Sequence, residues 1–315
     1  MKVLLVMSGN ILGVDSDTLE DYRLSHPFVV EQASHLSRLG VSFCLYPIKG
    51  KGILGYLKNI RPLMHTIRRE NPDIIHSHYG LSGFISVFYL RCPKVVTFHG
   101  TDLNLDKERM ISSVVSLFSD YRIFVSEKLV HRQIFRATKN FQVIPCGVNL
   151  NEFYPVEQEK AKELLGLDRT KRYILFASGF ANWIKNATLA FEAVHRLKDV
   201  ELLELSNRKR DEVNLLLNAV DVLLMTSFAE GSPVIIKEAM AANCPIVSTD
   251  VGDVKALVSG VDGCYISSYD PVDVAAKISL ALAFNGRTSG REKVLHLDNA
   301  LIAEKIYKIY QSLVA

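Results

Sequence analysis

The stretch SFAEGSPVIIKEAMAANCPIVSTDVG, residues 227–252, runs from the end of one apolar segment through a helical pattern into the next apolar segment. The preceding run is DVLLMTS, and the run that begins at Pro245 is again short and rich in β-branched residues. Short apolar strands joined by a helix are typical of a parallel sheet that is covered on both faces. Ligands of such sheets bind beyond the carboxyl ends of the strands, so a ligand is expected at the loop FAEGS.

The same alternation runs along the chain and begins afresh near its middle. Strands are predicted first at residues 2–8, 41–48, 73–78, 94–99, 122–126 and 141–145, with helices at 27–39, 53–69, 80–91, 107–118 and 127–136. Further strands are predicted at 172–178, 200–205, 221–227, 245–250 and 263–267, before an amphipathic helix at 300–314. Between the two parts, PCGVNLNEFYP (145–155) lacks periodicity and is predicted to be a linker. The chain is therefore expected to form two doubly wound α/β domains in series.

The bulk composition agrees with this organisation. A chain of 315 residues exceeds one typical domain, and 48% hydrophobic with 23% charged residues is typical of a soluble globular protein. No apolar run approaches the length of a bilayer span, and the run after Lys2 is too short for a signal peptide. The cysteines follow no Cys-x-x-Cys spacing, which favours reduced thiols and a cytoplasmic protein; they are Cys44, Cys92, Cys146, Cys244 and Cys264.

The positive charge is concentrated in the first half of the chain. Residues 1–150 hold 18 lysines and arginines against 12 acidic residues, although the whole chain carries only +3. This excess suits an anionic partner such as a phosphate or a membrane surface. It is too weak to indicate nucleic acid, and no basic stripe with interleaved aromatic residues is present.

Several enzyme classes are disfavoured because their motifs are missing. The sequence has no Gly-x-Gly-x-x-Gly after its first strand, no P-loop and no Gly-x-Ser-x-Gly elbow. His76 and His78 could in principle bind a metal, but without an obvious third ligand they are interpreted as a hydrogen-bonded structural pair. Asp15 and Asp17 are interpreted as solvated loop residues. No metal and no cofactor are expected.

The loop in the opening stretch has the features of an anion site. Ser232 is predicted to cap a helix whose first residue is Pro233, where a missing N–H costs nothing. The helix N-terminus then presents free backbone amides, those of Val234 and Ile235, together with the amides of Gly231 and Ser232. Free amides at this position favour a phosphate.

Two glutamates flank this anion site, with seven residues between them. Glu230 could be only an acid that complements the helix dipole. Glu238 lies about 7 Å further up the helix axis among apolar residues, where a carboxylate needs a hydrogen-bond donor. Either a ribose diol or a lysine or arginine from elsewhere in the fold would meet that need.

Four segments resemble those of retaining glycosyltransferases of the GT-B fold, family four. EGSPVIIKEAMAANCPIVSTDVGDV (230–254) is similar to the family's two-glutamate signature, and IPCGVNLNEFYP (144–155) to its interdomain linker. IIHSHYGLSG (74–83) and TFHGTD (97–102) resemble two N-terminal strand-end motifs. The resemblance covers most of the chain and implies two Rossmann-like domains that face a cleft. The expected boundaries are 1–149 for the acceptor domain, 150–297 for the donor domain and 298–315 for a C-terminal helix that returns toward the first domain.

The resemblance also implies roles for individual residues. Glu238 would accept the ribose hydroxyls of a nucleotide-sugar, whereas Glu230 and His99 would contact the donor sugar as the catalytic pair. Lys185 would neutralise the diphosphate. The donor would further contact Gly9, Gly179, Gly231, Ser232, Pro233, Val234 and Ile235.

The sequence departs from the family pattern at two places. Phe180 stands where the family usually has an arginine, so either another basic residue replaces it, with Arg172, Arg208 and Arg210 as candidates, or donor binding is weak. The segment between His195 and Arg210 is also short. The base edge is therefore assigned to Ser206 and Asn207.

The implied function is the transfer of a hexose from a UDP- or GDP-sugar to a glycan or lipid-linked acceptor, with retention, in cell-surface polysaccharide biosynthesis. A sugar-nucleotide epimerase of the same fold and a non-catalytic relative remain alternatives. A basic helix face, Lys58, Arg61, His65 and Arg68, with an apolar stripe of Leu54, Leu57, Ile60, Met64 and Ile67, leaves open either peripheral contact with the inner face of a membrane or simple solvation.

Overall fold

The computed structural model describes residues 1–10, 19–22, 26–135 and 138–314. Asp15 and Asp17 lie outside these residues. The chain divides into two compact units: unit 1 is Met1–Cys146 with Asn299–Ala315, and unit 2 is Gly147–Asp298. The units thus change over at 146/147 and 298/299, where the sequence suggested 149/150 and 297/298.

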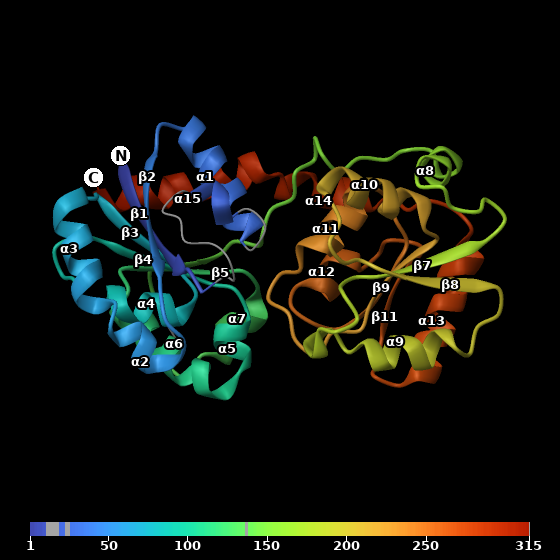
Figure 1. Ribbon diagram of the computed structural model, residues 1–315, viewed down its shortest axis with the longest axis horizontal. Coiled ribbons are helices and arrows are strands. Elements are labelled where there is room, and N and C mark those ends of the chain that lie inside the picture. Colours follow the sequence, from blue (N-terminus) through green and yellow to red (C-terminus); the bar gives the residue numbers. More distant parts are fainter. Residues whose placement is uncertain (11–18, 23–25, 136–137, 315) are drawn as a thin grey trace. The chain divides into compact units, whose positions relative to one another are not determined.

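Unit 1 is built on a six-stranded sheet in which every neighbouring pair is parallel (Figure 1). Its strands are β1 (Lys2–Ser8), β2 (Ser42–Ile48), β3 (Ile74–His78), β4 (Lys94–Phe98), β5 (Tyr121–Phe124) and β6 (Phe141–Val143). The spatial order is β2-β1-β3-β4-β5-β6, so the winding direction reverses between β1 and β3. Such a switch point opens a crevice at the carboxyl ends of the two strands.

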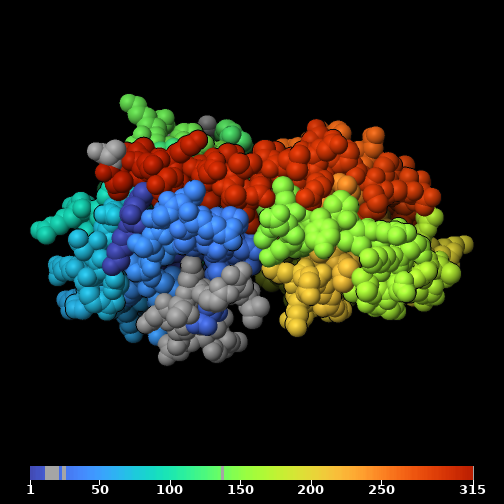
Figure 2. Space-filling model, turned by 90° about the horizontal axis from the view of Figure 1, so that it is seen from above, coloured from blue at the N-terminus to red at the C-terminus, as the bar shows by residue number. Residues whose placement is uncertain are grey.

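Helices cover this sheet and connect its strands. They are η1 (Leu19–Tyr22), α1 (Pro27–Arg38), α2 (Gly52–Leu57), α3 (Ile60–Glu70), α4 (Gly80–Ser86), α5 (Thr101–Asn104), α6 (Asp106–Phe118), α7 (Glu127–Arg132) and α15 (Asn299–Val314). The last helix packs along α1, where Asn299 Nδ2 donates to the buried Glu31 Oε2 over 2.7 Å. Figure 2 shows these two helices, red and blue, side by side.

The single helix predicted at 53–69 is wrong, because Asn59 interrupts it. The side chain of Asn59 is buried, and its Nδ2 donates to the carbonyls of Lys49 and Gly55 over 2.8 and 2.7 Å. These bonds divide the segment into α2 and α3. Leu54 and Leu57, predicted to be part of the apolar stripe, are instead 76% and 37% exposed.

Unit 2 repeats the architecture with a five-stranded parallel sheet of order β11-β10-β9-β7-β8. Its strands are β7 (Arg172–Phe176), β8 (Val200–Glu204), β9 (Val222–Met225), β10 (Ile246–Thr249) and β11 (Cys264–Ser267). The helices are α8 (Gln158–Leu164), η2 (Trp183–Lys185), α9 (Ala187–Val194), α10 (Arg210–Ala219), α11 (Val234–Ala241), α12 (Val254–Val258), α13 (Pro271–Phe284), α14 (Gly290–Val294) and η3 (Leu295–Leu297). Here the switch point lies between β7 and β9.

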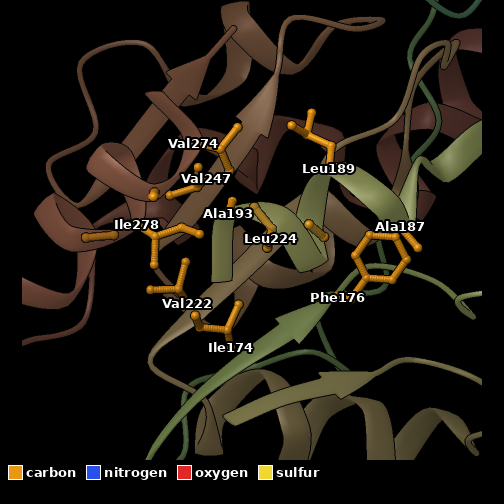
Figure 3. Packing of buried hydrophobic residues seen from close by; sticks show 13 residues of the cluster. Ile174, Phe176, Ala187, Leu189, Ala193, Val222, Leu224, Val247, Val274 and Ile278 are labelled. Carbon is orange, nitrogen blue, oxygen red and sulfur yellow. The ribbon is translucent and has the colours of Figure 1, made fainter. Parts of the chain in front are cut away.

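Apolar side chains of this sheet meet those of α9 and α13 in one core cluster. Figure 3 shows Phe176 and Leu224 on the strands, with Leu189 on α9 and Ile278 on α13, and all four are buried. The packing holds the carboxyl ends of β7 and β9 in fixed positions. The loops that follow these strands are therefore anchored at their base.

The predicted linker is anchored within unit 2. Phe153 is fully buried, and the guanidinium of Arg291 donates to the carbonyls of Phe153 and Leu150 over 2.7 and 3.0 Å. Val148 forms an isolated parallel bridge with Asp298, and its N–H donates to Leu297 O over 2.9 Å. The first and last residues of unit 2 thus lie side by side.

Candidate active site

The loops after β7 and β9 bring Lys185 and Glu230 together. Lys185 Nζ lies 2.6 Å from Glu230 Oε1, and both side chains are mostly buried. Asn182 caps η2 by accepting the N–H of Ile184, and Thr226 Oγ1 donates to Lys185 O over 3.0 Å. The end of β9 thereby holds the turn that carries Lys185. The structure places these two predicted site residues in direct contact at the switch point of unit 2.

Glu238 lies next to an arginine. Two kinds of hydrogen-bond donor are expected from the sequence for this carboxylate, a ribose diol or a basic side chain, and the arginine is of the second kind. The side chain is 8% exposed, and Arg210 Nη1 lies 3.4 Å from its Oε1. Arg210 is in turn held by Glu152, with Nε to Oε2 at 2.6 Å, and by the ring of Phe153 beneath it. Because the guanidinium also touches the linker segment, it connects the predicted ribose site to the entry of unit 2.

The other two candidate arginines lie elsewhere. Arg172 donates from Nη1 to Leu282 O, at the amino end of β7. Arg208 pairs with Glu212 on the exposed side of α10. Among the three arginines proposed to replace the missing phosphate ligand, only Arg210 contacts another predicted site residue.

Ser232 does not cap α11, contrary to the prediction. Pro233 occupies the N-cap position, and no side chain caps the helix. Ser232 Oγ instead lies 2.6 Å from Asp253 Oδ2 and 2.7 Å from Lys237 Nζ. Lys237 is fully buried and pairs with Asp253 at 3.0 Å. A buried ammonium needs a counter-ion and further hydrogen-bond acceptors. Asp253 supplies the counter-ion, and Ser232 Oγ is a further acceptor.

Lys237 and Asp253 were missed from the sequence. The available signal was a lysine between Ile236 and Glu238 in an otherwise apolar helix, with an aspartate in the loop after the next strand. Their interaction ties the glutamate loop to the loop after β10. Gly252 adds to this, because a Cβ at its φ of +54° would lie 2.4 Å from Gly231 O.

The residues assigned to the base edge lie beside Gly179. A Cβ on Gly179 would come within 3.3 Å of Ser206 Oγ, so the loops after β7 and β8 are adjacent. Asn207 follows with a left-handed φ of 53°. Phe180 donates its N–H to Glu204 Oε2 over 2.9 Å, and its ring packs on Phe176 and Phe191. The residue in place of the arginine thus extends the apolar core.

In unit 1, His99 is the partly exposed end of a chain of three imidazoles, of which His76 and His78 are buried. His99 Nε2 lies 2.9 Å from His78 Nδ1, and His78 stacks on His76. His76 is held by Tyr310 Oη at 2.5 Å and Thr97 Oγ1 at 2.7 Å. Burial lowers the pKa of His76 to about 3 and the pKa of both other rings well below the usual range, so all three are neutral at pH 7.

Asp102 organises the backbone around His99. Its carboxylate accepts the N–H groups of His99, Gly100 and Gly80 over 3.1, 2.8 and 3.3 Å. The side chain is buried, and burial raises the pKa of Asp102 to about 6. The sequence pattern TFHGTD contains this aspartate, but its role in the loop was not foreseen.

Gly9 follows the end of β1 and donates its N–H to Ile48 O over 2.8 Å. A Cβ at this position would lie 2.7 Å from Pro47 Cβ, so contact with β2 already requires a glycine. No cluster of three potential metal ligands occurs among the residues that the structure describes.

Comparisons with known proteins identify the family of the chain. Residues 25–152 match the model described as Glycosyltransferase Family 4, and residues 198–283 match that of Glycosyl transferases group 1. Together these segments cover more than half of the chain. The chain therefore belongs to family four of the glycosyltransferases, with the two Rossmann-like domains of the GT-B fold, and is a transferase.

One relative and two solved structures are similar to the chain over most of their length. An N,N'-diacetylbacillosaminyl-diphospho-undecaprenol alpha-1,3-N-acetylgalactosaminyltransferase of Campylobacter jejuni is 24% identical, over 90% of this chain and 89% of that protein. Sucrose-phosphate synthase from Thermosynechococcus elongatus superposes with a TM-score of 0.84 at 16% identity, covering 99% and 98% of the chains. HepE of Anabaena in complex with UDP and glucose does so with a TM-score of 0.76 at 15% identity, covering 99% of each chain.

Proposed function

We propose that this glycosyltransferase transfers a sugar, with retention of configuration, from a UDP- or GDP-sugar to a glycan or lipid-linked acceptor in cell-surface polysaccharide biosynthesis. The observation that carries the proposal is the contact of Lys185 with Glu230, in the loop that leads into α11, the helix that carries Glu238. These groups offer a cation, free helix amides and two carboxylates at one switch point. A nucleoside diphosphate sugar needs donors for its phosphates and acceptors for its hydroxyls.

The charges that develop in the reaction suit this arrangement. Cleavage of the glycosyl–phosphate bond leaves negative charge on the β-phosphate, which Lys185 and the amides of Val234 and Ile235 would stabilise. Positive charge grows on the sugar, near the carboxylate of Glu230. The acceptor oxygen then bonds to the anomeric carbon on the face that the phosphate leaves. Its proton passes to an oxygen of that departing phosphate.

His99 would contribute as a neutral hydrogen-bonding group. Because burial lowers its pKa well below the usual range, its ring does not add positive charge next to the developing oxocarbenium ion. We propose that its side chain contacts a hydroxyl of the donor sugar. No metal is required in this scheme, since Lys185 and the helix amides provide the phosphate charge compensation.

Titration calorimetry with UDP and GDP tests the donor site. Wild type should bind at least one of them, and Glu238→Ala should weaken binding by about tenfold or more through the lost ribose contact. Glu201→Ala, on the exposed face of β8, is the matched control and should bind as wild type does. If wild type binds neither UDP nor GDP, the proposal is overturned. Analysis of products formed from the donor alone would reveal an epimerase instead.

We further propose that unit 1 contacts a membrane surface through α2 and α3. Ile53, Leu54 and Leu57 are exposed on α2, and Arg61 and Arg68 are exposed on α3. Apolar side chains next to cations are typical of an interfacial helix. No helix in the described part of the chain is long and apolar enough to cross a bilayer.

Flotation with vesicles tests this contact. Wild type should float with vesicles that contain anionic lipid and less with neutral ones. Leu54→Ser and Arg61→Ser should each reduce flotation, whereas Leu164→Ser, at an exposed leucine on unit 2, should not. Equal flotation of all variants would contradict the proposal.

A further inference from the structure

A cavity of about 350 Å³ lies in unit 1 at the switch point of its sheet. Its wall includes Ser8 at the end of β1, Tyr79 directly after β3 and Thr101 at the start of α5. This is the crevice in which doubly wound sheets bind small molecules, and the volume falls at the lower end of the range for ligand pockets. It is large enough for a compact ligand of about one or two rings.

The wall of this cavity is acidic and aromatic. Asp102 and Glu108 contribute carboxylates, while His26, Tyr56 and Tyr79 contribute rings. The described residues that line the cavity include no lysine or arginine. Carboxylates repel a phosphate but accept hydrogen bonds from hydroxyl groups, and aromatic rings offer apolar faces for packing. This chemistry favours a neutral, hydroxyl-rich molecule.

Ser82 gives an independent sign of a ligand. Its side chain is 1% exposed and lines the cavity, yet its Oγ has no hydrogen-bond partner among the residues that the structure describes. A buried hydroxyl without a partner is costly, because it has lost its water without replacement. A ligand hydroxyl in the cavity would supply the missing hydrogen bond.

The cavity is continuous with the loop of the predicted catalytic histidine. The rings of Tyr79 and His99 are 4.7 Å apart, and Asp102 both lines the cavity and accepts the N–H of His99. A ligand in this cavity would therefore lie against the loop whose backbone positions His99.

We infer that this cavity binds a neutral pyranose of the acceptor, and that any phosphate of the acceptor remains outside it. The inference rests on the proposed function, since it names the class of acceptor group for that reaction. The carboxylate of Glu108 accepts hydrogen bonds from sugar hydroxyls and repels anions. Ser82 Oγ forms its missing hydrogen bond with a hydroxyl of the sugar, and the ring of Tyr79 packs against the pyranose ring.

Saturation-transfer NMR with two sets of probes tests the inference. Methyl glycosides of glucose, galactose and N-acetylglucosamine are compared with glucose 1-phosphate and glucose 6-phosphate, in the presence of saturating UDP or GDP, whichever wild type binds. At least one neutral glycoside should bind wild type more tightly than either phosphate does. Ser82→Ala should weaken that binding by about fivefold, the value of one hydrogen bond.

Charge reversal at the wall gives the sharper result. Glu108→Lys should invert the preference and gain at least tenfold in affinity for a sugar phosphate. Asp106→Lys is the control, because Asp106 lies two residues away, is 86% exposed and pairs with Arg109 outside the cavity. Tighter binding of phosphates by wild type, identical behaviour of the two lysine variants, or no glycoside binding while the nucleotide still binds would each overturn the inference. If wild type binds neither UDP nor GDP, the result would instead contradict the proposed donor site.

Discussion

Lys185 Nζ lies 2.6 Å from Glu230 Oε1, so the two side chains proposed to meet different parts of the donor neutralise each other in its absence. A diphosphate would compete with Glu230 for the ammonium group. Its arrival would release the carboxylate toward the sugar hydroxyls. The pair compensates both charges in a partly buried site, and a bound donor would replace one of the two partners.

Glu230→Gln should therefore separate binding from catalysis. Removal of the carboxylate frees Lys185, so the affinity for UDP should rise by about fivefold, the worth of one partly exposed ion pair. Transfer should nevertheless fall by about a hundredfold or more, because the contact with the developing charge is lost. Calorimetry and steady-state kinetics on the same preparation measure both. Weaker UDP binding by this variant would contradict the competition.

The buried Lys237–Asp253 pair predicts a large stability effect. Lys237→Met should lower the free energy of unfolding by about 3–5 kcal/mol, because it leaves Asp253 as an uncompensated charge in the interior. Lys237→Met combined with Asp253→Leu should recover much of that loss. Urea unfolding measures both, with Lys171→Met at an exposed ion pair as the control, where about 1 kcal/mol or less is expected. Similar losses at Lys237 and Lys171 would contradict this account.

Phe180→Arg should not restore the phosphate ligand of the family. The ring of Phe180 packs on Phe176 and Phe191, so replacement removes apolar contact and places a charge beside the core. We expect a loss of about 2 kcal/mol in stability and no gain in UDP affinity. Phe180→Leu, which keeps an apolar side chain, should lose less. Thermal unfolding measures the stability, and calorimetry measures the affinity for UDP. Tighter UDP binding by Phe180→Arg at unchanged stability would contradict the packing of Phe180 against the core.

The buried imidazole of His76 predicts acid lability. Its folded pKa of about 3 lies below the ordinary value of 6.5, so the unfolded chain binds the proton more strongly. The stability that the neutral ring allows is complete above pH 6.5 and declines as the pH falls toward 3. The slope should reach about 1.4 kcal/mol per pH unit.

His76→Gln removes this titration. Urea unfolding between pH 7 and pH 4.5 should show a shallower decline for the variant than for wild type, whatever its absolute stability. Parallel curves would show that His76 does not titrate as proposed.

The strands were predictable because near-continuous apolar runs between turn signals leave few alternatives. The helix at 53–69 was not, because its periodicity continues through Lys58 and Asn59 and only the buried bonds of Asn59 to Lys49 and Gly55 end it. The two glutamates could be singled out as site candidates from their spacing around a helix start. The partnership of Ser232 with Lys237 and Asp253 was not, because it joins residues through space and overrides the local preference of serine for a cap.

The bridge between Val148 and Asp298 makes unit 2 a cassette with adjoining ends. A segment from Gly147 to Asp298 could be excised as one continuous piece or closed into a ring by a short peptide, without stretching any of its strands. The C-terminal helix then belongs with the first half of the chain, and a truncation before Asn299 would strip α1 of its cover rather than shorten the second domain. Segmental labelling of unit 2 for NMR could exploit the same two junctions.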